Sequence, residues 1–145
     1  MGSEYERIFY SGPIDEYFNY KFGELPYRSL RFEFLKFERP YFQSNAVINY
    51  PCNYEFTRIG EYKYFLGSQS KATTVSYEYP QLFVLGKNER YYPLFTDSAR
   101  AAYLKYASEA SNVGNLILFG RLGDYKYYDM DKVIASALAV TDKLF

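Results

Sequence analysis

The segment of residues 120–131, GRLGDYKYYDMD, gathers residue types that can do binding chemistry. One arginine stands between two glycines, three tyrosines follow it, and two aspartates close the segment. A tyrosine offers both a flat apolar face and a hydroxyl, which suits sugars and planar ring systems. The segment is too polar for a core and too aromatic for an ordinary surface loop, so we expect a binding loop.

A helix over residues 129–145 is expected to follow this loop. Its apolar residues recur at helical spacing, at Val133, Ile134, Ala137, Leu138 and Leu144. Asp129 then stands at the helix N-terminus, where free backbone N–H groups and the positive end of the helix dipole favour a negative ligand. The alternative for Asp129 is a plain N-cap.

A further helix and two short strands are expected near the two ends of the sequence. Residues 96–112 read as a helix with Thr96 or Asp97 as N-cap. Residues 7–12 and 115–120 read as short apolar strands that need neighbouring strands. We therefore expect both strands to be pieces of a larger layer that an inserted sheet interrupts.

Four strands are expected between these ends, over residues 27–37, 44–51, 54–66 and 71–80, and they suggest an antiparallel meander. The period of the third strand places four of its side chains on one face, those of Phe56, Arg58, Tyr62 and Tyr64. The predicted fold class is therefore α+β.

Composition excludes several classes of function. The chain of 145 residues has zero formal net charge, which argues against a general nucleic-acid or membrane binder. It has no histidine, which removes Ser-His-Asp triads, Cys-His pairs and histidine metal sites, and we assign no metal ligand. Its single cysteine, Cys52, fits a reducing compartment, so we expect a cytoplasmic location. The 19 tyrosines are ambiguous, because half-buried strand positions also favour tyrosine.

Several motifs together resemble the UDP-galactopyranose mutase family, in order and spacing, over about residues 7–142. They are GPIDEYFNYKFGELPYRSLRFE, NAVINY, FTRIGEYKYF, EYP, YYP and GRLGDYKYYDMD. The resemblance implies a cytoplasmic isomerase that interconverts UDP-galactopyranose and UDP-galactofuranose for cell-surface polysaccharides. It implies FAD as cofactor, with N5 of reduced FAD attacking the anomeric carbon and no net redox change.

The resemblance also implies residue roles. No side chain is assigned as catalytic, because the flavin is the catalyst. The implied substrate-binding residues are Arg58, Tyr92, Tyr127 and Asp129. The implied cofactor-binding residues are Arg28, Gly120, Arg121, Asp129 and Met130. An arginine among tyrosines suits a diphosphate, while the plainer alternatives are a strand-face salt bridge for Arg58 and ordinary surface charges for Arg28 and Arg121.

The chain departs from the family pattern at several points. A G-x-G-x-x-G fingerprint and the helical substrate domain are missing, so the chain resembles the C-terminal part of such an enzyme. Tyr62 and Tyr64 stand where the family often has histidine, and Phe119 stands where it usually has glycine. We expect residues 1–24 to be the returning strand of a FAD-binding domain, 25–95 an antiparallel sheet, and 96–145 a helix-strand-helix closing the FAD-binding layer.

Three functions remain open at this stage. The first is part of a nucleotide-sugar mutase that alone lacks high FAD affinity and turnover. The second is a free-standing, non-catalytic binding or assembly module derived from the family. The third, an unrelated tyrosine-rich carbohydrate-binding domain, is disfavoured by the ordered motifs. Because apolar faces would be left bare, the expected partners are a second copy of the chain or an N-terminal half-protein, besides the nucleotide sugar.

Overall fold

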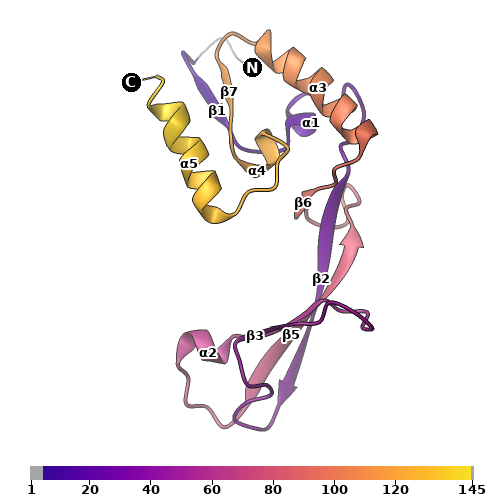
Figure 1. Cartoon of the computed structure of the whole chain (residues 1–145), viewed down its shortest axis with the longest axis vertical. Coiled ribbons are helices and arrows are strands. Elements are labelled where there is room, and N and C mark those ends of the chain that lie inside the picture. Colours follow the sequence, from indigo (N-terminus) through magenta and orange to yellow (C-terminus); the bar gives the residue numbers. More distant parts are fainter. Residues whose placement is uncertain (1–4, 145) are drawn as a thin grey trace. The chain divides into compact units, whose positions relative to one another are not determined.

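The computed structural model describes residues 5–144, which form two compact units. The first unit contains the chain up to Tyr27 and from Arg90 onward, and the second is Arg28–Glu89. Helices and an antiparallel sheet confirm the predicted α+β class (Figure 1). No helix within residues 5–144 has the length and apolar character needed to cross a membrane. The functional assignment of the three predicted segments stays a prediction.

The first unit holds four helices and three strands apart from the start of the long strand β2. In chain order they are β1 (Ile8–Tyr10), α1 (Ile14–Tyr17), β6 (Tyr92–Pro93), α3 (Asp97–Ser111), β7 (Leu116–Leu118), α4 (Gly120–Gly123) and α5 (Met130–Thr141). The predicted helices over 96–112 and 129–145 thus correspond to α3 and α5. Thr96 is the N-cap of α3, since its Oγ1 accepts a hydrogen bond from the Ala99 N–H at 3.1 Å.

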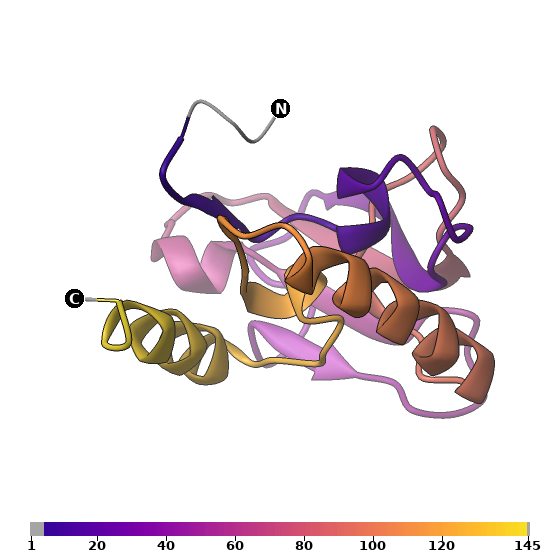
Figure 2. The same ribbon diagram turned by 90° about the horizontal axis from the view of Figure 1, so that it is seen from above.

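The two short apolar strands of the first unit form a parallel pair. Ile8 of β1 lies opposite Leu116 of β7, and Tyr10 lies opposite Leu118. Figures 1 and 2 show the two strands side by side. Parallel strands need a long crossover connection between them. Here the connection is the chain between residues 10 and 116, so the pair joins residues that are far apart in the sequence.

Buried polar groups fix the loop that follows α1. Tyr106 of α3 is fully buried, and its hydroxyl accepts from the Phe22 N–H at 2.9 Å and donates to the Gly23 carbonyl at 2.7 Å. Asp15 is also fully buried and accepts from the Leu25 N–H at 2.9 Å. Burial raises the pKa of the Asp15 carboxyl above its ordinary value, although hydrogen bonds and Arg90 oppose the shift.

The second unit holds the rest of β2 and the other elements. They are β2 (Tyr27–Phe37), β3 (Val47–Asn49), β4 (Arg58–Glu61), α2 (Lys63–Leu66) and β5 (Thr73–Leu82). The strand order β3-β4-β5-β2 is antiparallel throughout, so the predicted simple meander is wrong for β2. β2 pairs with β5 rather than β3 because these two long strands match in length over ten residue pairs.

The predicted strand over residues 54–66 is wrong on both sides of β4, because residues 54–57 are not strand and the strand ends at Glu61. The chain turns into α2 after Tyr62, whose backbone is already helical, and α2 ends at Gly67 with φ +59°. Phe56 packs against Tyr77, whereas Arg58 lies opposite Glu78. Because Tyr77 and Glu78 are neighbours on β5 and point to opposite faces of the sheet, Phe56 and Arg58 do not share a face as predicted. The alternating aromatic residues therefore led to a wrong strand prediction.

Lys63 gives the physical reason for the turn into α2. Its ammonium group donates to the backbone carbonyls of Pro40, Ser70 and Ala72. An ammonium group has three donors, and all three are used here. The first residue of α2 is thereby tied to the two segments that flank it.

Glu61 supplies a second buried polar centre in this unit. It is fully buried and accepts from Thr73 Oγ1 at 2.6 Å, from the Phe42 N–H at 2.9 Å and from the Gln43 N–H at 3.0 Å. Burial alone would raise the pKa of the Glu61 carboxyl, but these hydrogen bonds and Lys63 hold that pKa below its ordinary value. The charged form of Glu61 therefore stabilises the folded unit.

Candidate functional site

Three predicted site residues of the first unit lie together. The rings of Tyr92 and Tyr127 meet edge to face, with centroids 5.7 Å apart. The Arg121 guanidinium carbon lies 5.5 Å from the centre of the Tyr127 ring. No hydrogen bond of the Tyr92 or Tyr127 hydroxyl occurs among residues 5–144, so both hydroxyls are available to a ligand.

Arg121 fixes the loop that carries these tyrosines. Its Nε donates to the Tyr128 carbonyl at 3.1 Å, and a terminal nitrogen donates to the same oxygen. Its other terminal nitrogen lies 3.5 Å from the Tyr91 carbonyl oxygen. Much of the guanidinium is thus engaged with backbone, which fixes the loop at Tyr128, the residue after Tyr127. Its predicted contact with a cofactor stays a prediction.

Tyr125 supports the same loop and was missed by the sequence analysis. Its hydroxyl lies 2.6 Å from the Pro26 carbonyl oxygen and 3.0 Å from that of Leu94. Burial raises its pKa to about 12. Its φ of +48° is rare for a bulky residue, and it turns the chain between Asp124 and Lys126. A tyrosine amid other tyrosines carries no sequence signal for such a backbone role.

Glycine is favoured at two positions before the loop. Gly120 has φ +80°, a region that side chains rarely adopt. A Cβ at Gly123 would lie 3.1 Å from the Tyr10 carbonyl oxygen, so a larger residue there would have to push slightly against β1. Phe119, in contrast, has φ −161°, which any residue adopts, so this departure from the family pattern costs no backbone strain.

The N-terminus of α5 is open. Asp129 occupies the N-cap position with extended backbone, yet its side chain makes no capping hydrogen bond. Met130, the first helical residue, is 83% exposed. The first-turn N–H groups therefore lack a side-chain cap, and together with the helix dipole they suit a negatively charged group.

The two predicted arginines of the second unit share one face of its sheet. Arg28 and Phe32 are four residues apart on β2 and therefore point to the same face. Glu78 of β5 lies opposite Phe32 on one side and opposite Arg58 on the other, so Arg58 shares this face. Arg58 Nε donates to Asn49 Oδ1 at 2.9 Å, and its guanidinium lies 3.7 Å from the Glu78 carboxylate. The strand-face salt bridge is therefore present. The Arg58 side chain is still 43% exposed, so one side of its guanidinium faces solvent.

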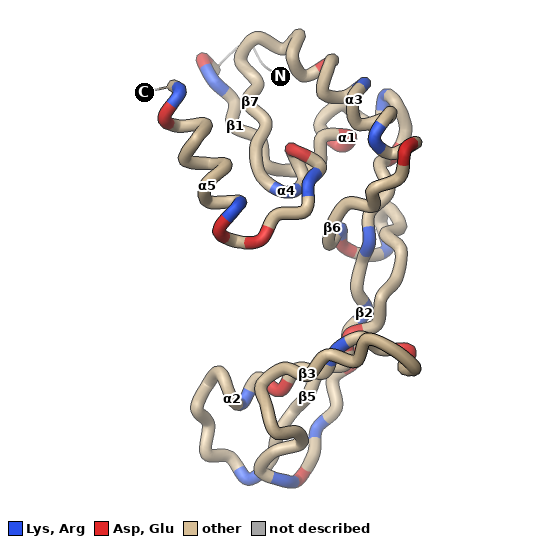
Figure 3. The backbone as a smooth tube through the Cα atoms, viewed as in Figure 1, with Lys and Arg blue, Asp and Glu red and all other residues tan. Residues whose placement is uncertain are grey.

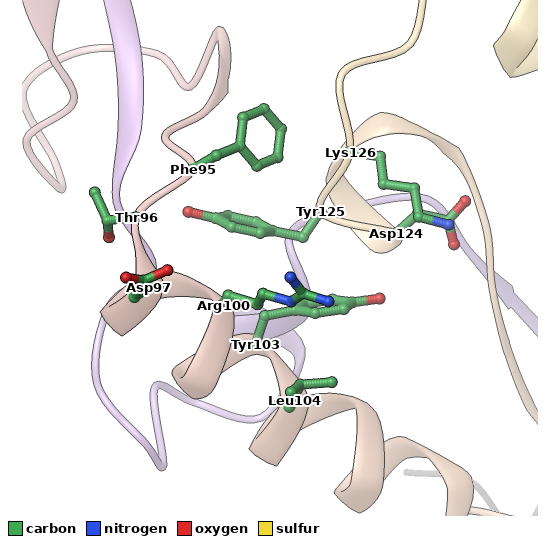
Figure 4. A pocket seen from close by; sticks show the side chains of 9 residues that line it. All are labelled: Phe95, Thr96, Asp97, Arg100, Tyr103, Leu104, Asp124, Tyr125 and Lys126. Carbon is green, nitrogen blue, oxygen red and sulfur yellow. The ribbon is translucent and has the colours of Figure 1, made fainter.

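The first unit also contains a pocket of about 500 Å³, and no predicted site residue lines it (Figure 4). Tyr103 and Tyr125 stack in it with ring centroids 5.5 Å apart. Its lining residues are Phe95, Thr96, Asp97, Arg100, Tyr103, Leu104, Asp124, Tyr125 and Lys126. Two carboxylates and two cations surround this aromatic floor, so the pocket favours no single charge of ligand. No cluster within residues 5–144 brings three possible metal ligands together.

The first unit of this α+β chain offers free tyrosine hydroxyls and an open helix N-terminus, and the second unit offers partly exposed arginines; each of these groups suits a phosphate-bearing ligand. The chain belongs to the UDP-galactopyranose mutase family, whose family model matches residues 1–127. The resemblance of the motifs is thereby confirmed.

Individual relatives agree with this assignment. The chain is 41% identical to a probable UDP-galactopyranose mutase of Klebsiella pneumoniae, over 97% of its own length. It is 40% identical to the UDP-galactopyranose mutase of Mycoplasma pneumoniae, over 94% of its length. It is 34% identical to a dTDP-fucopyranose mutase of Escherichia coli, over 93% of its length. In each case the match covers 36% of the relative, so the chain spans about a third of these proteins.

Proposed function

We propose that this chain supplies one part of the nucleotide-sugar and flavin site of a mutase that interconverts UDP-galactopyranose and UDP-galactofuranose. Family membership supports the reaction class. The observation that carries the site is the pairing of Tyr92 with Tyr127, because both hydroxyls are free and the ring contact holds them near one another. The choice of sugar follows the names of the two UDP-galactopyranose mutase relatives described above.

The substrate diphosphate is the ligand for these hydroxyls. Tyr92 and Tyr127 can each donate to a phosphate oxygen without breaking an existing hydrogen bond. Arg58, in the second unit, is a further proposed phosphate donor on the ground of the family resemblance alone, and it shares its guanidinium with Glu78. The neutral tyrosine donors bind the diphosphate while leaving it free to depart and return as the leaving group.

The flavin is the proposed cofactor, and the residues of the chain fit an anionic ring system. Reduced FAD, when bound, supplies the nucleophile for the anomeric carbon. The uncapped N-terminus of α5, at Asp129 and Met130, offers backbone N–H groups to a negative charge. Gly120 is itself buried, so its proposed cofactor contact rests on the family resemblance. In the second unit, Arg28 is exposed with no ion pair among residues 5–144. Arg121 holds the loop of the first unit in place through the Tyr128 carbonyl.

A second candidate is a binding or assembly module without catalysis. Its support is the Arg58–Glu78 ion pair, which occupies part of the only charged donor assigned to the diphosphate. Such a module would bind uridine diphosphate without flavin and would show no exchange when flavin is added.

Titration of the purified chain with UDP and with FAD, each alone, tests the proposal. Tyr127→Phe and Tyr92→Phe should each weaken UDP binding about tenfold, because each removes one hydrogen bond to a charged oxygen. Tyr91→Phe is the matched control, since Tyr91 is a neighbouring exposed tyrosine without an assigned role. Equal affinities for all three variants would contradict the proposed diphosphate site.

A second assay separates the two candidates. Reduced FAD and UDP-galactopyranose are added to the chain alone, and pyranose–furanose exchange is followed by chromatography. We expect no turnover by the chain alone, because it spans about a third of the length of its relatives. Exchange should appear when the rest of the fold is supplied. Continued absence there, with UDP still bound, favours the non-catalytic module.

A further inference from the structure

The contact of Tyr92 with Tyr127 joins β6 to the loop before α5, two segments that are far apart in the sequence. The two rings meet edge to face, and neither hydroxyl makes a hydrogen bond among residues 5–144. One such ring contact is a modest interaction. The spacing of the two hydroxyls must therefore be set by whatever holds the two backbones together.

The Tyr125 hydroxyl joins these two backbones. Tyr125 stands two residues before Tyr127, and its hydroxyl lies 2.6 Å from the Pro26 carbonyl oxygen and 3.0 Å from the Leu94 carbonyl oxygen. Leu94 stands two residues after Tyr92, and its N–H donates to the same Pro26 carbonyl at 3.0 Å. The hydroxyl thus ties the loop that carries one site tyrosine to the segment that carries the other.

The ring of Tyr125 is fixed by its aromatic neighbours. It meets Tyr27 edge to face at 5.3 Å, stacks on Tyr103 at 5.5 Å and meets Phe95 edge to face at 6.1 Å between centroids. Figure 4 shows Phe95, Tyr125 and Tyr103 layered in this order. A ring enclosed in this way cannot change its rotamer freely, so the hydroxyl is held in one place.

Tyr125 is also the only buried residue of the segment 124–131. Its two neighbours in the sequence are charged, and Figure 3 shows charges of both signs beside α4. Its backbone has φ +48°, which a bulky residue adopts only when its surroundings enforce it. The side-chain contacts of Tyr125 therefore anchor the whole segment to the body of the first unit.

Arg121 joins the same two segments more weakly. It donates to the Tyr128 carbonyl within its own loop, whereas its contact with the Tyr91 carbonyl is long, at 3.5 Å. The Tyr125 hydroxyl lies 3.0 Å from the Leu94 carbonyl oxygen, well within hydrogen-bonding distance. Of the two ties between the segments, the one made by Tyr125 is the shorter and the more buried.

We infer that Tyr125 is the positioning residue that holds the Tyr92 and Tyr127 hydroxyls at the spacing at which both donate to one diphosphate. Its own hydroxyl is committed to backbone carbonyls, so it acts through the two segments and not as a donor to the ligand. The inference rests on the proposed diphosphate site. The positioning of the two rings can nevertheless be measured without a ligand.

Tyr125→Phe tests the inference, because it keeps the packed ring and removes only the hydroxyl. One readout is the nuclear Overhauser effect between the ring protons of Tyr92 and Tyr127 in the tyrosine-labelled chain without ligand. The other readout is the affinity for UDP, measured by titration. We expect the Overhauser effect to disappear and UDP to bind about tenfold more weakly, because the two donors no longer reach the diphosphate together.

Two further variants separate positioning from a general loss of stability. Tyr103→Phe is the matched control, because its ring stacks on Tyr125 while its hydroxyl makes no hydrogen bond within residues 5–144. Tyr106→Phe removes a hydroxyl bridge elsewhere in the first unit. Both should keep the Overhauser effect and the UDP affinity. In a chain that already carries Tyr92→Phe and Tyr127→Phe, adding Tyr125→Phe should change UDP affinity by less than about twofold, because no site hydroxyl is left to position.

An unchanged Overhauser effect and an unchanged UDP affinity in Tyr125→Phe would overturn the inference, and so would an equal loss in Tyr103→Phe. If Tyr125→Phe removes the Overhauser effect while Tyr92→Phe and Tyr127→Phe leave UDP affinity unchanged, the positioning stands and the diphosphate site is wrong. Should Tyr125→Phe fail to fold, the unmodified chain decides. UDP must then stabilise the tie that helps to bind it and slow the amide exchange of Leu94. Equal exchange with and without bound UDP would also overturn the inference.

Discussion

The two units of this protein differ in how completely each satisfies its own packing. The second unit is continuous in sequence, its four strands pair with one another, and its buried charges Glu61 and Lys63 are fully hydrogen-bonded. The first unit leaves the parallel pair with open edges and α5 without a buried residue. The difference shows that a unit can satisfy the hydrogen bonds of its buried loops and still leave apolar outer surfaces uncovered.

Removing the Glu61 carboxylate is the strongest test of the second unit's independence. Glu61→Ala should lower the free energy of unfolding of this unit by about 3 kcal/mol, since it leaves one buried donor and two partly buried donors without this acceptor. Urea-dependent hydrogen exchange, followed on peptides from each unit, measures the loss. Glu38→Ala is the control, because Glu38 is exposed and pairs only with Lys36. A loss spread equally over both units would contradict their independence.

Tyr106→Phe is the corresponding test of the first unit. It removes the hydroxyl that bridges Phe22 and Gly23 and should cost about 2 kcal/mol of unfolding free energy. The same exchange experiment should report the loss in peptides of the first unit. Tyr103→Phe is the matched control from the same helix, because the Tyr103 hydroxyl makes no hydrogen bond within residues 5–144. An equal effect of both variants would show that ring packing, rather than the hydroxyl bridge, stabilises the loop.

Acid should affect the two units in opposite directions. The folded second unit lowers the pKa of Glu61, so its stability is present above the ordinary value of 4.5 and is lost as pH falls through the lowered value. The folded first unit raises the pKa of Asp15, so its stability is greatest below the ordinary value of 3.8 and is lost as pH rises through the raised value. Protonation removes only part of the Glu61 hydrogen-bond network. We therefore expect acid to lower the free energy of unfolding of the second unit by less than Glu61→Ala does.

Two variants sharpen the pH comparison. Glu61→Gln should flatten the acid response of the second unit, and Asp15→Asn should flatten that of the first. Unfolding by urea is measured at several pH values, with peptide-level exchange to assign each transition. Parallel slopes for both units would contradict the opposite environments of these carboxylates.

The smallest expected effect concerns α5. In the isolated chain Leu138→Asp should change the unfolding free energy by less than about 0.5 kcal/mol, because Leu138 is already 58% exposed. Thermal unfolding of this variant beside Ala139→Asp measures the difference. A large loss in Leu138→Asp alone would mean that the chain itself covers the side of α5 that carries Leu138.

Strongly patterned elements could be predicted from the sequence. The alternation over residues 27–37 matches β2, and the capped pattern over 96–112 matches α3 with Thr96 as its cap. Residues 62–66 were assigned wrongly because their alternating tyrosines imitate a strand. Tertiary contacts of Lys63 with three carbonyls decide the helix there, and no local pattern encodes those contacts.

The candidate site could be predicted only as a set of residue types. The YYP motif named Tyr92 and the motif of residues 120–131 named Tyr127, but their contact depends on long-range folding. The salt bridge of Arg58 with Glu78 needed the strand register, which a single sequence does not fix. Tyr125 was missed because its role rests on a left-handed backbone and two distant carbonyls.

The pairing of Ile8 with Leu116 has a consequence for the order of folding. β1 is synthesised before the second unit, and its partner strand is made only after the whole second unit has been synthesised. Closing so long a loop is slow unless its interior is already compact. The second unit, with its contacts close in sequence, is therefore expected to fold during synthesis and to shorten the effective distance between β1 and β7. The inserted sheet would then act as the scaffold on which the two ends of the chain find each other.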